Sequence, residues 1–485
     1  MLNRTALLAL IFLMLTAQAV QPRDQPGTHG IRYITYEEAR PILTPLNEIL
    51  PPELRPQDSK DMPSLWSNWV AHRDAEIRAR LARGDEDSIV NFLLFGTSFT
   101  QNPRIKLGDL AQAGTKNLLN TDPAASAAAG FIKLIQTRID DFIKALETPA
   151  KNERLLFARQ LIDRKGFNPK NSQGRESIER YLMGNVARVF NEQASYARVL
   201  ESARLLGDPS AEFAERSKLF ATRGLSSDAS LLPNFAIEQA LASLKDQRFL
   251  AAGSVHRIGI IGPGLDFTDK QDGYDFYPQQ TIQPFAAIDT LLRLGLARAN
   301  ELQIATFDLS ERVNDHLRRA VTNASRGIAY TIQLPREDDG SWKAETIDYW
   351  RQFGDRIGTP TKPAAVPATL GKMGVRAVRI KPAIVSLLKP EDANIVLQRQ
   401  DLSSTQRFDL LIATNILVYY DVFEQSLALA NIASMLRPGG FLLSNNALLE
   451  LPVSRMRSVG YQTVVYSTKP NDGDHIVWYQ RAADN

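Results

Sequence analysis

The stretch from Arg257 to Asp266 constrains the fold most, because a short apolar run ends there in a glycine turn. The run has no charge after Arg257, which predicts a strand buried within a parallel sheet. Gly262 and Gly264 follow at its carboxyl end, where open α/β sheets bind nucleotide-like ligands. A plain structural turn is the alternative. No third glycine completes a dinucleotide fingerprint, and Phe267 also disfavours NAD.

Strands and helices alternate after this turn. Apolar runs predict strands at Leu302 to Phe307, Phe408 to Thr414 and Phe441 to Asn445. Helical periodicity falls between or beside them at Asn234 to Leu250, Thr281 to Ala299, Glu311 to Ala324 and Val422 to Leu436. Such alternation predicts a largely parallel sheet with helices on both faces.

The end of the chain breaks this alternation. Tyr461 to Thr468 and His475 to Gln480 are β-rich runs with only a Pro-Asn-Asp-Gly-containing connection between them. Two strands joined in this way predict an antiparallel hairpin. The second half of the chain is therefore predicted to be an α/β sheet closed by a C-terminal antiparallel hairpin.

The first 19 residues resemble a secretory signal peptide. Arg4 precedes an apolar run from Ala6 to Leu15, and Ala17-Gln18-Ala19 forms a small-residue cleavage site. Cleavage there predicts a mature chain that begins at Val20 and is exported to the periplasm or the outside of the cell. An uncleaved anchor is the alternative, although the run is short for spanning a bilayer. No later segment has the apolar length of a membrane span.

Residues 20–63 are rich in proline and predict an extended lead-in with short helical pieces. Helical patterns follow over residues 64–224, which predicts an α-helical domain of unknown role. Trp66 and Trp69 lie one turn apart there and are interpreted as core residues. The remaining domain is predicted to cover residues 225–485, with an insert at 325–390 that contains several prolines.

Composition excludes several classes of function. The chain has 485 residues, 44% of them hydrophobic, which is enough for two or three domains. Its formal net charge is +3 with no concentrated basic run, so no nucleic-acid partner is expected. There is no cysteine, and the five histidines show no metal-ligand spacing, so no metal site is expected.

Two motifs in the second half resemble a known family. Phe408 to Asp421 and Leu436 to Leu443, which includes Arg437-Pro438-Gly439-Gly440, look like the fourth strand and the turn before the fifth strand of class I S-adenosylmethionine-dependent methyltransferases. The first motif is closest to the chemotaxis receptor methyltransferases. Residues 64–224 do not resemble the receptor-recognising domain of those enzymes, so a glutamyl substrate is not implied.

The resemblance implies a doubly wound, Rossmann-like methyltransferase sheet and S-adenosylmethionine as cofactor. Gly262 and Gly264 match the turn around the methionine portion, and Asp308 matches the acid that accepts hydrogen bonds from the ribose hydroxyls. Asp401 matches the polar residue beside the adenine. Asn415 matches the residue near the transferred methyl group.

The chain departs from the family pattern at the glycine turn. Ile260 stands where an acidic residue is usual, and Asp266 stands where a third glycine is common and is counted among the cofactor-binding candidates. An inserted segment, Phe267 to Pro284, lengthens the path to Asp308. We expect this segment to fold over the sheet edge, with Tyr274 and Tyr277 shaping the acceptor pocket.

Two functions follow from these residues. One is an exported methyltransferase that acts on an unknown small-molecule or protein acceptor, with Asn415 and Tyr419 as candidate catalytic residues. Tyr419 and Tyr420 are otherwise interpreted as packing or as walls of the pocket. The alternative is an inactive scaffold or binding protein of the cell envelope, suggested by Ile260 and by export away from the compartment where the cofactor is made.

Overall fold

The computed structural model describes residues 30–55, 61–105, 123–205, 220, 223–268, 274–337, 340–469 and 472–483. The predicted signal peptide lies outside these ranges. The helices are α1 (Tyr36–Leu43), α2 (Met62–Phe95), α4 (Pro123–Glu147), α5 (Glu153–Arg164), α6 (Ser172–Leu205), α8 (Leu232–Asp246), α9 (Gln283–Arg293), α10 (Glu311–Ser325), α11 (Ala344–Gln352), α12 (Pro382–Val385) and α13 (Val422–Met435). The strands are β1 (Ile31–Tyr33), β2 (Arg257–Ile261), β3 (Gln303–Asp308), β4 (Tyr330–Glu337), β5 (Gly358–Thr361), β6 (Met373–Ile380), β7 (Leu388–Asp392), β8 (Gln398–Gln400), β9 (Phe408–Ala413), β10 (Leu436–Ser444), β11 (Met456–Val465) and β12 (Gly473–Arg481).

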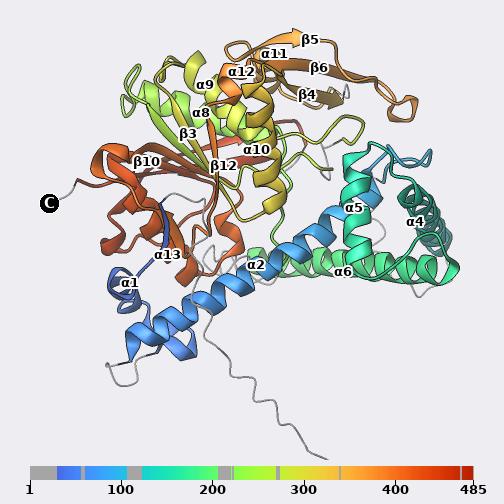
Figure 1. Cartoon of the computed structure of the whole chain (residues 1–485), viewed down its shortest axis with the longest axis horizontal. Helices are drawn as coiled ribbons and strands as arrows, with labels where there is room; N and C mark the ends of the chain where they lie inside the picture. The colour runs from blue at the N-terminus through green and yellow to red at the C-terminus, as the bar shows by residue number, and fades with distance from the viewer. Residues whose placement is uncertain are drawn as a thin grey trace, which may run out of the picture.

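A seven-stranded sheet forms the centre of the larger lobe in Figure 1, in the order β11-β12-β10-β9-β2-β3-β7. Pairing is parallel from β7 through β10, whereas β12 is antiparallel to both β10 and β11. This arrangement confirms the predicted α/β class and its C-terminal hairpin. The chain builds outward from β2 to β3 and β7, then returns to place β9 on the other side of β2. The carboxyl ends of β2 and β9 therefore lie at a topological switch point, where open α/β sheets bind ligands.

Alternate residues of the central strands belong to two different hydrophobic cores. Ile258 and Ile260 pack with helices α8, α9 and α10 on one face. Ile261 and Phe307 pack with α13 on the other face. Both faces of these strands are buried, which explains the continuous apolar runs in the sequence.

Described residues of the lead-in belong to the hydrophobic core on the face of the sheet that α13 covers. β1 pairs antiparallel with β8, and α1 places Ala39, Ile42 and Leu43 in the core that contains α13. Trp66 and Trp69 of α2 belong to the same core, as predicted, with ring centroids 5.2 Å apart. The structure therefore corrects the predicted division at residue 63, because the lead-in and the start of α2 are integral to the sheet lobe.

Helix α2 joins the two lobes, as its diagonal course in Figure 1 shows. Its end, from Ile89 to Phe95, packs with α4, α5 and α6 in a third core. The helix is continuous, and Gly84 allows close contact: a Cβ on Gly84 would lie 1.8 Å from the main-chain oxygen of Leu225.

The insert at 325–390 includes β4, β5 and β6, which form their own antiparallel sheet in the order β4-β6-β5. Leu334, Phe353 and Val378 from this insert join the core around α8 and α9. In Figure 1 its strands lie at the top of the molecule, together with α11 and α12 of the same insert. The insert thus covers the helices on one face of the main sheet.

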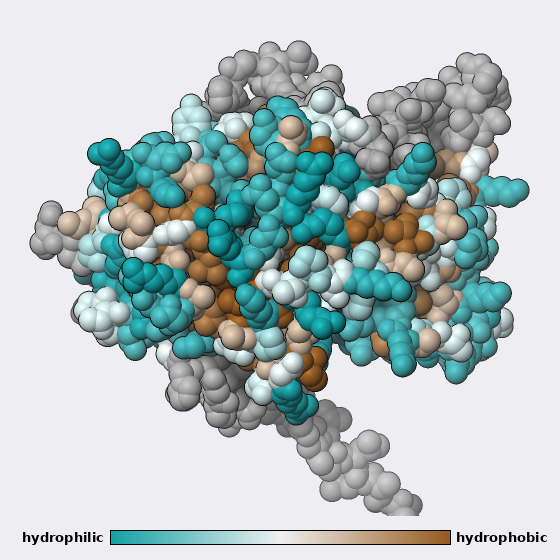
Figure 2. Space-filling model, turned by 90° about the horizontal axis from the view of Figure 1, so that it is seen from above, coloured by the Kyte–Doolittle hydropathy of each residue, from teal (hydrophilic) through white to brown (hydrophobic). Residues whose placement is uncertain are grey.

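The surface is mostly polar on the face shown in Figure 2, where hydrophobic residues gather in separate patches between hydrophilic side chains. Among the residues that the structure describes, no helix has both the length and the apolar character needed to cross a bilayer.

Candidate functional site

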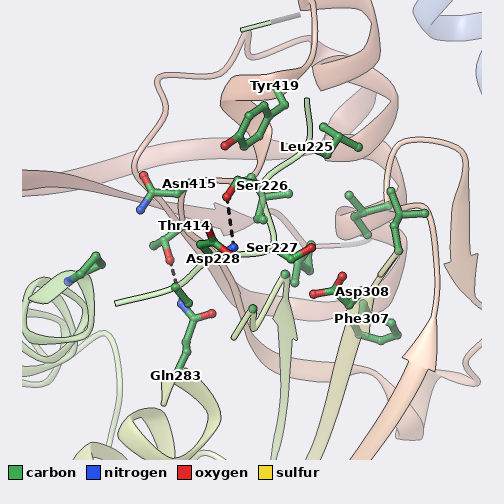
Figure 3. A pocket seen from close by; sticks show the side chains of 18 of the residues that line it. Leu225, Ser226, Ser227, Asp228, Gln283, Phe307, Asp308, Thr414, Asn415 and Tyr419 are labelled. Atoms are coloured by element: carbon green, nitrogen blue, oxygen red, sulfur yellow. Dashed lines mark hydrogen bonds between the residues drawn. The ribbon is translucent and has the colours of Figure 1, made fainter. Parts of the chain in front are cut away.

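A cavity of about 290 Å³ lies at the carboxyl ends of β2, β3 and β9. Each of these strands contributes its last residue or the turn that follows it. The opposite wall is formed by Leu81 of α2 and by residues 225–230 (Figure 3). We call residues 225–230 the covering segment. The cavity therefore lies between the sheet on one side and α2 with the covering segment on the other.

The glycine turn brings main chain close to this cavity. Gly262 and Gly264 have φ angles of +67° and +61°, in the left-handed region that favours glycine. A Cβ on Gly262 would lie 2.1 Å from Cδ1 of Ile416, and one on Gly264 would lie 2.8 Å from Cβ of Ala229. Both positions therefore favour glycine for conformation, and Gly264 also for space, because the main-chain oxygen of Ser227 would lie 2.9 Å from its Cβ.

Asp308 ends β3 and lines the cavity, with only 9% of its surface exposed. The main-chain N–H of Ser310 donates to its Oδ1 at 2.8 Å. Burial raises the pKa of Asp308 to about 6, and the N–H groups of Ser310 and Gly264 oppose this rise by stabilising the charged form. At neutral pH the side chain is therefore an ionised acceptor facing a sheltered space.

Asn415 follows β9 and lies at the rim of the same cavity, with φ of +60°. Its main-chain N–H donates to Oδ1 of Asn445 at 2.8 Å, and Nδ2 of Asn445 donates back to its side-chain oxygen. Beside it, Nε2 of Gln283 donates to Oγ1 of Thr414 at 2.8 Å. Sequence reasoning missed Asn445 and Gln283, since each contacts the site through residues distant in sequence.

Tyr419 also lines the cavity, from the short 3-10 turn Leu417–Tyr419. Burial raises the pKa of Tyr419 to about 12, so its phenol stays protonated at neutral pH. Nη2 of Arg80 donates to its main-chain oxygen at 2.9 Å, and a ring edge contact joins it to Phe220. Because its phenol stays protonated, Tyr419 is better suited to forming part of the cavity wall or donating a hydrogen bond than to acting as a general base.

Asp266 lies elsewhere. Its Oδ2 accepts hydrogen bonds from the hydroxyl of Tyr277 at 2.8 Å and from Nε2 of Gln280 at 2.9 Å. It borders a second, much smaller cavity of about 20 Å³, together with Tyr277. Asp266 is therefore placed to hold its own loop together and not to line the larger cavity.

Tyr274 and Tyr277 do not border the larger cavity, so the prediction that their rings shape a pocket beside Gly262 is wrong. Both rings are buried, and their segment docks on the helical lobe instead. The carboxylate of Asp275 accepts the main-chain N–H groups of Thr97 and Ser98 just after α2. The described residues of the inserted segment therefore connect the two lobes through hydrogen bonds.

Asp401 is also away from the cavity. It follows β8, which pairs with β1 and not with the main sheet, and its carboxylate lies 3.5 Å from Nε of Arg32. The third strand of the sheet is β7, and Ala393 and Ile395 after it border the cavity. This corrects the placement of Asp401: the apolar run before β8, Ile395 to Leu397, is buried against the lead-in and belongs to no strand of the main sheet.

No group of three or more metal-ligating side chains gathers within the described residues.

In comparisons with known proteins, no protein-family model and no curated protein matches the chain. Solved structures do. N-methyltransferase NodS from Bradyrhizobium japonicum WM9 in complex with S-adenosylhomocysteine aligns at 12% identity over 60% of this chain and 98% of that chain, with a TM-score of 0.24.

Two further solved structures are similar over part of the chain. The glycopeptide N-methyltransferase MtfA complexed with S-adenosylmethionine aligns at 10% identity over 52% of this chain and 79% of that chain, with a TM-score of 0.21. MtNAS in complex with MTA and tNA aligns at 11% identity over 78% of this chain and 98% of that chain, with a TM-score of 0.24. The strand order and the reversed β12 are themselves those of the class I methyltransferase fold.

Proposed function

We propose that the cavity binds S-adenosylmethionine and that the chain transfers its methyl group to an acceptor. One observation supports this most: Gly262, Gly264 and Asp308, each predicted to contact the cofactor, line one cavity at the ends of adjacent strands. Asn415 and Tyr419 line it as well. The residues come from β2, β3 and β9, on both sides of the topological switch point.

The lining chemistry fits the parts of this cofactor. Asp308 offers two carboxylate oxygens to the two hydroxyls of a ribose, and only one of them accepts the hydrogen bond from Ser310. Leu309, Ala393 and Ile395 form an apolar part of the wall that suits the adenine ring. The glycine turn lines the part of the cavity expected to receive the methionine portion, and its missing Cβ atoms let Ile416 and Ala229 approach the main chain there.

The bound cofactor supplies a methyl group already activated on a sulfonium. The chain's own residues then have to align an acceptor and exclude water. Asn415 is at the rim, fixed by Asn445, where it can orient an acceptor by hydrogen bonding. Tyr419 keeps its proton at neutral pH and would donate a hydrogen bond there.

Titration calorimetry of the purified protein with S-adenosylhomocysteine tests this proposal. We expect saturable binding at one site, and transfer of labelled methyl from S-adenosylmethionine to material in an extract of the source cells. Absence of binding to either compound would contradict the proposal. Binding without transfer would favour the inactive alternative, which the buried Ile260 at the usual acidic position also supports.

We expect cofactor binding to weaken in mild acid. Below pH 6 Asp308 becomes neutral and loses the charge that strengthens its hydrogen bonds. The dissociation constant of 5′-methylthioadenosine, which lacks the amino acid portion, should be constant above pH 7 and rise by up to about tenfold per pH unit below 6. Calorimetry across this range measures the effect.

The fold should survive this titration. Because the pKa of Asp308 is raised on folding, its ionised form opposes folding above pH 6, and this penalty disappears as the pH falls toward the unfolded value of about 3.9. Asp308→Asn provides the control, since its weaker binding should not vary with pH. An unchanged profile in the variant would assign the titration to another group.

We also propose that the chain is exported and cleaved after Ala19, since Met1 to Ala19 has the three regions of a signal peptide. N-terminal sequencing of the protein from its source cells should then give Val20 as the first residue. An intact Met1 in a cytoplasmic fraction would contradict export.

A further inference from the structure

Two charged side chains, Asp228 and Asp308, are found among the described residues that line the cavity, and both are acidic. Asp308 ends β3 and has the ribose as its expected partner. Asp228 belongs to the covering segment, and the sequence assigned it no role. A cavity wall with two carboxylates and no basic side chain among these residues favours a ligand that carries positive charge.

The covering segment fixes Asp228 beside the glycine turn. The N–H of Ala229 donates to the oxygen of Leu265 at 2.8 Å, and the N–H of Leu265 donates to the oxygen of Ser227 at 2.8 Å. Asp228 lies between these two hydrogen bonds and forms a parallel bridge with Leu265. The main chain of Asp228 is thus held next to the turn expected to receive the methionine portion of the cofactor, and Asp228 lines the cavity there.

The side chain of Asp228 is also positioned from α2. Oγ of Ser88 donates to its Oδ1 at 2.9 Å, and its own N–H donates to Oγ of Ser226 at 3.1 Å. One of the two dashed lines in Figure 3, between Ser226 and Asp228, marks the second of these bonds. These contacts fix the carboxylate before any ligand arrives.

Asn234 adds a second acceptor to the same cavity. It lies at the start of α8 and is 3% exposed. Its Nδ2 donates to the main-chain oxygens of Ser230 at 3.0 Å and Leu231 at 3.1 Å, which fixes the orientation of the amide. Its Oδ1 is buried and has no hydrogen-bond partner among the described residues. A buried acceptor of this kind suits a ligand that brings a donor.

We propose that Asp228, together with Oδ1 of Asn234, binds the α-ammonium group of S-adenosylmethionine. An ammonium group offers both a positive charge and several N–H donors, which match a carboxylate and a lone amide oxygen. Asp228 thereby takes the place of the acidic residue that Ile260 replaces in the strand. This inference rests on the proposed function.

A structural role for Asp228 alone is the competing explanation. Its Oδ1 lies 3.8 Å from Nη2 of Arg312, and Oδ1 of Asp85 lies at the same distance from that nitrogen. Arg312 also stacks over the rings of Phe157 at 4.3 Å and Phe267 at 4.9 Å. Asp85 therefore matches Asp228 as a neighbour of Arg312 but does not line the cavity, which makes it the control.

The test compares two ligands on three proteins. For Asp228→Asn we expect the dissociation constant of S-adenosylhomocysteine to rise by about 10- to 100-fold. That of 5′-methylthioadenosine, which has no ammonium group, should change by less than about threefold, since it makes no contact with Asp228. Asp85→Asn should bind both compounds as the wild type does. Calorimetry on the full mature chain measures all six values.

Other outcomes would overturn the inference. Equal weakening of both ligands in Asp228→Asn, or the same loss in Asp85→Asn, would assign Asp228 to packing around Arg312. Weaker binding of S-adenosylmethionine with unchanged S-adenosylhomocysteine would assign it to the sulfonium. If the wild type binds neither compound, the proposed function fails first, so the two failures are distinguishable.

A measurement without substitutions covers the case in which Asp228→Asn does not fold. The wild type should bind the analogue of S-adenosylhomocysteine that has hydrogen in place of its α-amino group about 10- to 100-fold more weakly than the parent compound. Equal binding of the two would overturn the inference.

Discussion

Replacement of Arg154 by methionine should lower the free energy of unfolding by at least about 3 kcal/mol, since several buried main-chain acceptors lose their donor at once and each loss costs about 1–3 kcal/mol. Arg154 lies on α5 and is 1% exposed. Its guanidinium donates to the main-chain oxygens of Asp266, Phe267, Tyr274 and Tyr277. Methionine keeps the apolar volume but supplies no donor.

The effect should be strongest where the lobes meet, because three of the four acceptors belong to the inserted segment and the fourth, Asp266, directly precedes it. Denaturant unfolding measures the loss, and limited proteolysis should show faster cleavage in the segment 266–277. Arg164→Met is the matched control, since Arg164 is on the same helix but exposed. A loss below about 1 kcal/mol in Arg154→Met would show that water replaces the guanidinium.

Replacement of Asp308 by alanine should weaken binding of S-adenosylhomocysteine by about 1.5–3 kcal/mol, the range for hydrogen bonds to charged groups. Unlike Asp228→Asn, it should weaken 5′-methylthioadenosine by the same amount, because both compounds contain the ribose. The fold should be retained, since the variant removes a buried carboxylate whose pKa is already raised by burial. Calorimetry with both ligands measures the change.

Asp401→Ala is the matched control for this experiment. The structure places Asp401 beside Arg32 with 67% of its side chain exposed, so binding of both ligands should be unchanged. A loss in Asp401→Ala equal to that in Asp308→Ala would mean that the cofactor lies along β8. Unchanged binding in Asp308→Ala would show that another acid accepts from the ribose.

The sequence by itself determined the fold of the second half and several cavity residues. Strands buried on both faces have continuous apolar runs, and the turn after β2 needs glycine at two left-handed positions. These signals are local, since each depends on a strand and the residues directly after it. The resemblance to the methyltransferase family added Asp308 and Asn415, the polar residues that end or follow β3 and β9, and both line the cavity.

The tertiary structure alone decided what closes the cavity. Asp228 reaches it because the covering segment pairs with Leu265, and the lead-in enters the core because β1 pairs with β8. Asp401 lies outside the site because of the same pairing between β1 and β8. Tyr274 lies against the helical lobe because Arg154 donates a hydrogen bond to its main-chain oxygen. Each of these placements depends on hydrogen bonds and packing between segments far apart in the chain, for which no local pattern of residues is sufficient.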